Sequence, residues 1–78
     1  QGAHSGNRRM KPLSGREFAR LVERHGWTLL RVHGSHHIYG RAGSVVRLSI
    51  PIHGNRPLKT GLLRHLAKLA ALPDGELD

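Results

Sequence analysis

The central stretch of the chain, residues 27–40, reads WTLLRVHGSHHIYG and decides the fold. Residues 27–33 and 36–40 are rich in side chains that favour strands, and a Gly34-Ser35 pair separates them. A pair of this kind is typical of a tight hairpin turn. The spacing therefore predicts two adjacent antiparallel strands over residues 27–33 and 36–40.

A third strand is expected immediately after this hairpin, over residues 44–51. Val46, Leu48 and Ile50 alternate there with Val45, Arg47 and Ser49. Alternation of this kind places one set of side chains on a buried face and the other set on an open face. Because the connections are short, the three segments predict an antiparallel three-stranded meander.

Two amphipathic helices flank the predicted sheet. The first begins with Ser14-Gly15-Arg16-Glu17, which has the pattern of a capping box, and Gly26 ends it, so a helix is expected over residues 14–25. The second should run from residue 59 or 60 to residue 71, before Pro73. Its apolar stripe comprises Leu62, Leu63, Leu66, Leu69 and Ala70. The order α-β-β-β-α predicts an α+β fold like that of double-stranded-RNA-binding domains, with both helices on one face of the sheet.

Length and composition predict one small domain over residues 13–72, with a flexible segment at 1–12 and a loose acidic tail at 73–78. Met10 is a candidate native start, with residues 1–9 left over from recombinant expression. The 78 residues include no cysteine, which excludes disulfides and thiol nucleophiles, and no apolar run approaches a membrane span. These features predict a soluble protein of a reducing cytoplasm.

The chain is strongly basic: 13 Lys and Arg stand against 5 Asp and Glu, for a formal charge of +8. Such a field attracts polyanions, and nucleic acid is the expected partner rather than a membrane. The side chains expected to form the polyanion surface are Arg31, Arg41, Arg47, Arg56 and Lys59. Trp27 is expected in the core, whereas Tyr39 is open between core packing and base stacking.

His36 is the sharpest candidate for chemistry, because imidazole can give and take a proton near neutral pH. Strand side chains alternate, so His37 must point to the opposite face. Ile38 has the character of a core residue, which would turn His36 towards the helices and His37 towards solvent. A position at the end of the strand, beside a turn, would instead leave His36 at the rim of the sheet. Alternation leaves open which histidine acts. With His33 and His53 they match no common zinc spacing, so neither a metal site nor a cofactor is predicted.

From residue 13 to residue 72 the chain resembles the HicA family of toxins from bacterial toxin–antitoxin systems. The similarity lies in the order and spacing of short motifs: Leu21-Val22-Glu23, Gly26-Trp27, Gly34-Ser35-His36 with Tyr39, Ile50-Pro51-x-His53 and Lys59-Thr60-Gly61. Two positions depart from the family pattern. Leu62 replaces a usual threonine, and Ala70-Ala71 replaces a common Ala-Gly pair near the end of the last helix.

The resemblance implies metal-independent cleavage of messenger RNA by an endoribonuclease that a HicB-type antitoxin neutralises. It assigns the catalytic role to His36, keeps His37 as a reserve and gives His53 a supporting role. Gly34 and Ser35 would help to hold the RNA. The antitoxin is expected to be acidic and to cover the histidine turn.

Two alternatives from other classes remain open at this point. A non-catalytic RNA-binding module would account for the charge and the fold equally well. An inactive adaptor that binds only another protein is the third reading of the sequence.

Overall fold

The computed structural model describes residues 11–73 and 75–77 of the chain. Most of the segment predicted to be flexible (residues 1–10), together with Asp74 and Asp78 of the acidic tail, lies outside the described residues.

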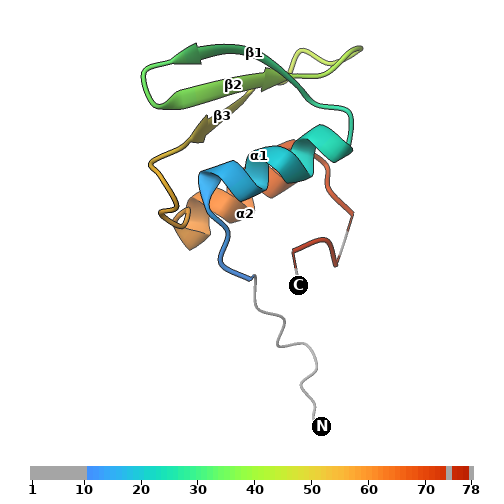
Figure 1. The fold of residues 1–78 in the computed structure, drawn as a ribbon. Coiled ribbons are helices and arrows are strands. Elements are labelled where there is room, and N and C mark those ends of the chain that lie inside the picture. The colour runs from blue at the N-terminus through green and yellow to red at the C-terminus, as the bar shows by residue number, and fades with distance from the viewer. Residues whose placement is uncertain (1–10, 74, 78) are drawn as a thin grey trace, which may run out of the picture.

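Five elements follow one another in the predicted order. They are α1 (Gly15–Arg24), β1 (Thr28–His33), β2 (His36–Gly40), β3 (Leu48–Pro51) and α2 (Thr60–Leu69). The sheet is antiparallel with the order β1-β2-β3, and the two helices lie on the same side of it, with β3 nearest to them and β1 farthest away (Figure 1). The α+β prediction is confirmed.

The core lies between the helices and the inner half of the sheet. Its members come from both helices, from β2 and β3, and from the connecting segments: Phe18, Ala19, Leu21, Val22, Trp27, Tyr39, Leu48, Ile50, Leu58, Leu63, Leu66, Ala70 and Leu77. No residue of β1 belongs to this set, and all six residues of that strand are exposed. The sheet therefore extends beyond the helices that cover it.

The N-terminus of α1 is fixed by local hydrogen bonds and by a close packing contact. The Ser14 hydroxyl accepts a hydrogen bond from the Glu17 N–H at 3.0 Å, and Glu17 Oε1 accepts one from the Ser14 N–H at 2.9 Å, which confirms the predicted capping box. A Cβ atom on Gly15 would lie only 2.0 Å from the carbonyl oxygen of Pro51. Glycine at this position therefore allows the start of α1 to sit against the end of β3.

The third strand is shorter than predicted, because it begins at Leu48 rather than at residue 44. The Ser44 hydroxyl accepts a hydrogen bond from the Val46 N–H at 3.1 Å, and the Arg47 guanidinium donates to the carbonyl oxygens of Ser44 and Val46. These local bonds occupy backbone groups that pairing with a neighbouring strand would need, so the strand begins only at Leu48. The alternation was predicted correctly, since Leu48 and Ile50 are buried while Ser49 is exposed.

The C-terminal region also differs from the prediction. Helix α2 ends at Leu69, and Ala71 adopts a left-handed φ of +56°. The tail is not loose along its described part. Leu77 is buried and its carbonyl oxygen accepts a hydrogen bond from the Lys11 N–H at 2.9 Å, while Glu76 Oε1 lies 3.0 Å from His25 Nε2.

Candidate functional site

The histidine turn joins β1 to β2 through two residues. His33 and His36 are register partners on either side of it, and Gly34 between them has a φ of +62°. Only glycine adopts this conformation at little cost, so the Gly-Ser sequence sets the tight reversal. The turn places the imidazoles of His33 and His36 on the same face of the sheet, as neighbours across two strands.

The two adjacent histidines of β2 lie on opposite faces. His37 pairs with Ile50, which is fully buried, so its side chain lies on the helix side of the sheet. His36 pairs with Pro51 and is exposed on the open side. The expectation that His36 would face the helices, with His37 in solvent, is wrong.

The error came from taking Ile38 as the core residue of this strand. Tyr39 is the core residue: its side chain is 3% exposed and it pairs with the buried Leu48. Ile38 is only half-buried and lies opposite the exposed Ser49. Because strand side chains alternate, this difference of one position reverses the face of every residue in β2.

His37 is poorly placed to meet a dissolved substrate. Its side chain is half-buried, and its Nδ1 atom is buried without a hydrogen-bond partner among the described residues. His36 has neither restriction. Burial and strand register therefore separate two histidines that strand alternation in the sequence left open.

His33 is a site neighbour that sequence reasoning did not assign to the chemistry. Its Cα pairs with that of His36, and it is exposed. The sequence of the turn could have predicted this neighbour, because a two-residue hairpin turn pairs the residues on either side of it.

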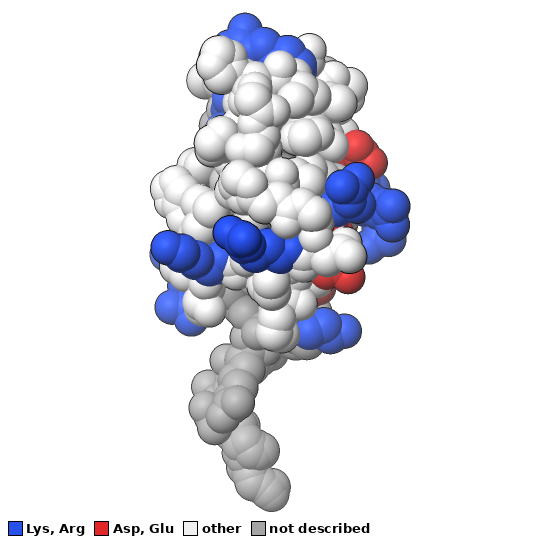
Figure 2. All heavy atoms as spheres, turned by 60° about the vertical axis from the view of Figure 1, so that its left-hand side comes forward, with Lys and Arg blue, Asp and Glu red and all other residues white. Residues whose placement is uncertain are grey.

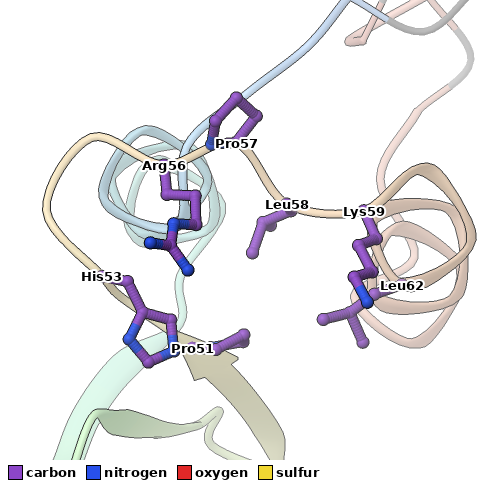
Figure 3. A pocket seen from close by; sticks show the side chains of 7 residues that line it. All are labelled: Pro51, His53, Arg56, Pro57, Leu58, Lys59 and Leu62. Atoms are coloured by element: carbon purple, nitrogen blue, oxygen red, sulfur yellow. The ribbon is translucent and has the colours of Figure 1, made fainter.

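A hydrogen bond connects the histidine turn to the loop that follows β3. The Ile52 N–H donates to the Ser35 carbonyl oxygen at 2.9 Å, immediately before His53. His53 lies at the mouth of a pocket of about 250 Å³ between the end of β3, this loop and the start of α2 (Figure 3). Its lining residues are Pro51, His53, Arg56, Pro57, Leu58, Lys59 and Leu62.

The five predicted basic residues fall into separate places rather than into one continuous surface. Arg56 and Lys59 join His53 at the pocket. Arg41 and Arg47 line a second, more open hollow of about 320 Å³ beside Leu30 and Gly40. Arg31 lies in β1 opposite Ile38. On the side of the molecule shown in Figure 2, Lys and Arg form several groups around an uncharged centre, with Asp and Glu at one margin.

The aromatic side chains are committed to the core. The Tyr39 hydroxyl donates a hydrogen bond to Glu23 Oε2 at 2.8 Å, and burial together with this carboxylate raises the pKa of Tyr39 to about 12. Trp27 is 2% exposed, as predicted, and the Arg41 guanidinium lies 4.5 Å from the centre of its ring. Neither ring is free to stack on a base.

The carboxylates of the described chain are occupied away from the histidine turn. Glu17 caps α1, Glu23 binds Tyr39 and Glu76 lies against His25. Across residues 11–73 and 75–77, no three His, Cys, Asp or Glu side chains come close enough together to hold a metal ion. In the same residues, no helix is long and apolar enough to cross a membrane.

The site therefore consists of the exposed His36 on a glycine turn, His33 beside it, and the basic pocket. The hydrogen bond between Ser35 and Ile52 holds the turn against the loop that lines this pocket. A comparison with curated proteins returned no match. The family model for the HicA toxin of bacterial toxin–antitoxin systems matches residues 15–72, from the first residue of α1 to just beyond α2. The chain therefore belongs to the HicA toxin family and, as a member of it, has a cognate antitoxin as its partner.

Proposed function

We propose that this toxin is an endoribonuclease that cleaves messenger RNA without a metal cofactor and so inhibits translation and growth. The observation that carries the proposal is the exposed imidazole of His36. A glycine turn holds it on the open face of the sheet, and next to it lies a basic pocket whose described lining residues include no carboxylate. A positioned imidazole in a positive field is suited to proton transfer at a phosphodiester.

In the proposed reaction His36 removes the proton from a ribose 2′-hydroxyl. The 2′-oxygen forms a bond to the adjacent phosphorus, and the bond between that phosphorus and the 5′-oxygen of the next nucleotide breaks. His53 gives its proton to the departing 5′-oxygen, which leaves a 2′,3′-cyclic phosphate and a 5′-hydroxyl end. Arg56, Lys59 and the backbone of Gly34 and Ser35 would stabilise the added negative charge.

The experiment compares His36→Ala with His37→Ala, two substitutions of one residue type at adjacent positions of β2. Wild type and His37→Ala should arrest bacterial growth and yield RNA fragments with cyclic phosphate ends, whereas His36→Ala should do neither. Circular dichroism checks that both variants are folded. Equal cleavage by wild type and His36→Ala would overturn the assignment, and loss of activity only in His37→Ala would transfer it to the reserve residue.

A non-catalytic RNA-binding module is the second candidate function, and one observation favours it. The hollow lined by Arg41 and Arg47 is a separate basic surface that needs no histidine. A binding module would hold RNA with an affinity that falls steeply with salt, because phosphate contacts release counterions. If purified wild type binds RNA in this way and never shortens it at large molar excess, the module is the correct reading.

For the partner, we propose an acidic HicB-type antitoxin in the bacterial cytoplasm that blocks the site by covering it. The open face of the sheet carries both His36 and Arg31, so one partner surface can reach the imidazole and a cation at the same time. Carboxylates of the antitoxin would lie among Arg31, Arg41, Arg47 and Lys59. Such complementarity speeds association, and the buried centre of the interface supplies most of the affinity.

A further inference from the structure

The pocket at the end of β3 combines two kinds of surface that rarely serve the same ligand. Pro51, Pro57, Leu58 and Leu62 supply apolar walls. His53, Arg56 and Lys59 supply nitrogen donors, and none of the described residues that line the pocket is a carboxylate. A simple anion would not need the apolar walls, and an apolar peptide would not need three basic groups. A planar aromatic group that carries a phosphate satisfies both surfaces.

We propose that this pocket binds one nucleotide of the RNA, with its base against the apolar walls and its phosphate at Arg56 and Lys59. The inference rests on the proposed function, because it places that nucleotide next to the phosphodiester attacked with the help of His36. Bases stack on flat apolar and aromatic surfaces without strong sequence preference, and basic side chains follow the backbone. The arginine fork also suits phosphate oxygens.

The pocket is formed before any ligand arrives, because its loop is fixed to the rest of the fold. The Leu58 N–H donates to the Leu13 carbonyl oxygen at 2.7 Å, and Ser14 forms an isolated bridge with Pro57. The Arg56 N–H donates to the His53 carbonyl oxygen at 3.0 Å, which closes the turn between them. A preformed wall loses little conformational freedom on binding, which favours affinity.

The basic side chains of the pocket are free to bind a ligand. Within the part of the chain that the structure describes, His53, Arg56 and Lys59 are exposed and make no side-chain hydrogen bond or ion pair. In Figure 3 they come from the loop and from the residue just before α2, around the same hollow. By contrast, Arg47 in the other hollow already donates to two carbonyl oxygens.

The pocket also lies at the right place relative to His36. Pro51, one of its walls, is the register partner of His36 in the neighbouring strand. Neighbouring strands are about 5 Å apart, so His36 lies one strand spacing from a wall of the pocket. Adjacent nucleotides of one RNA can therefore occupy the pocket and place a phosphate at His36. The Ser35–Ile52 hydrogen bond maintains this spacing.

The test measures binding directly, in the His36→Ala protein, so that the proposed catalytic group cannot act on the ligands. Each of the four nucleoside 3′-monophosphates is titrated while NMR follows the Leu58 and Leu62 methyl groups, the His53 ring and the side chains of Arg41 and Arg47. Ribose 5-phosphate and inorganic phosphate are the probes without a base. At least one nucleotide should bind about tenfold more tightly than either probe and shift the pocket signals. Equal binding of ribose 5-phosphate, or shifts confined to Arg41 and Arg47, would overturn the proposal.

A matched pair of variants separates the pocket from general positive charge. Arg56→Gln removes a cation from the pocket, and Arg64→Gln removes one from the exposed side of α2 outside it. Nucleotide affinity should fall several-fold only in Arg56→Gln. Equal losses of affinity in both variants would mean that the overall positive charge attracts the nucleotide, and the pocket would not be its binding site.

Failure of this proposal can be told apart from failure of the proposed function. If wild type cleaves RNA but nucleotides do not bind in the pocket, the pocket proposal is wrong and the nuclease stands. If nucleotides bind in the pocket but wild type never cleaves RNA, the pocket proposal is correct, the nuclease proposal is wrong and the protein is an RNA-binding module.

Discussion

The backbone N–H of Ile52 donates a hydrogen bond of 2.9 Å to the carbonyl oxygen of Ser35. Ser35 belongs to the turn that presents His36, and Ile52 precedes His53 at the mouth of the basic pocket. One backbone contact therefore holds together two segments that lie 17 residues apart in the chain. The proposed base and the proposed acid are therefore positioned at the same end of the sheet.

The first prediction concerns the second proton-transfer group. His53→Ala should lower kcat for RNA cleavage by about a hundredfold and remove the alkaline limb of the pH–rate profile, because a general acid must be protonated to act. The profile is measured on a short RNA under single-turnover conditions. His33→Ala is the matched comparison; loss of the alkaline limb in that variant alone would assign the acid to His33.

A second prediction tests the close approach between α1 and β3. Gly15→Ala should lower the free energy of unfolding by about 1–3 kcal/mol, because the new methyl group would collide with the Pro51 carbonyl oxygen, a backbone atom. Gly61→Ala is the control: nothing lies within 4 Å of its Cβ position, so higher helix propensity should raise stability by up to about 1 kcal/mol. Urea denaturation measures both. A neutral Gly15→Ala would contradict the packing described here.

The end of α2 supplies a stabilising substitution. Ala71 holds a left-handed φ of +56°, which costs a residue with a Cβ atom roughly 1 kcal/mol relative to glycine. Ala71→Gly should therefore raise the midpoint of urea denaturation. In the interior of the same helix, Ala67→Gly should lower it by a similar amount or more. A fall in both variants would show that residue 71 does not act as the C-terminal cap.

The raised pKa of Tyr39 predicts a loss of stability in alkali. The folded chain keeps the phenol protonated up to a pKa of about 12, mainly because of burial and then because of Glu23, whereas the unfolded chain ionises near its ordinary value of 10.0. The stabilisation is complete below pH 10 and is lost as pH rises towards 12, to a total of about 3 kcal/mol. Tyr39→Phe should remove this component of the alkaline slope. An unchanged slope would refute the prediction.

The proposed antitoxin contact predicts a salt-dependent association rate. Stopped-flow mixing of the toxin with its cognate antitoxin should show a rate constant that falls with ionic strength, because charge complementarity steers the encounter. Arg31→Gln should slow association several-fold, whereas Arg16→Gln, on the exposed side of α1, should change it little. Hydrogen exchange should show protection around residues 34–37 in the complex. Unprotected residues there would exclude blockade of His36.

The sequence by itself determined the order and type of the elements, because local patterns specify them. The Ser14 and Glu17 side chains begin α1 through bonds between near neighbours, and Gly34-Ser35 reverses the chain within two residues. The HicA motifs lie on these same local features. Each depends on residues close together in the chain, so a linear reading was sufficient.

Only the tertiary structure decided which histidine faces solvent. Ile38 and Tyr39 are both large enough to be core residues, and the choice depends on Leu48 from another strand and on Glu23 from α1, which binds the Tyr39 hydroxyl. The pocket and the docked tail likewise arise from contacts between distant segments. Alternation along a strand predicts that its side chains lie on two opposite faces. Packing against the helices decides which face is buried and which one carries the candidate site.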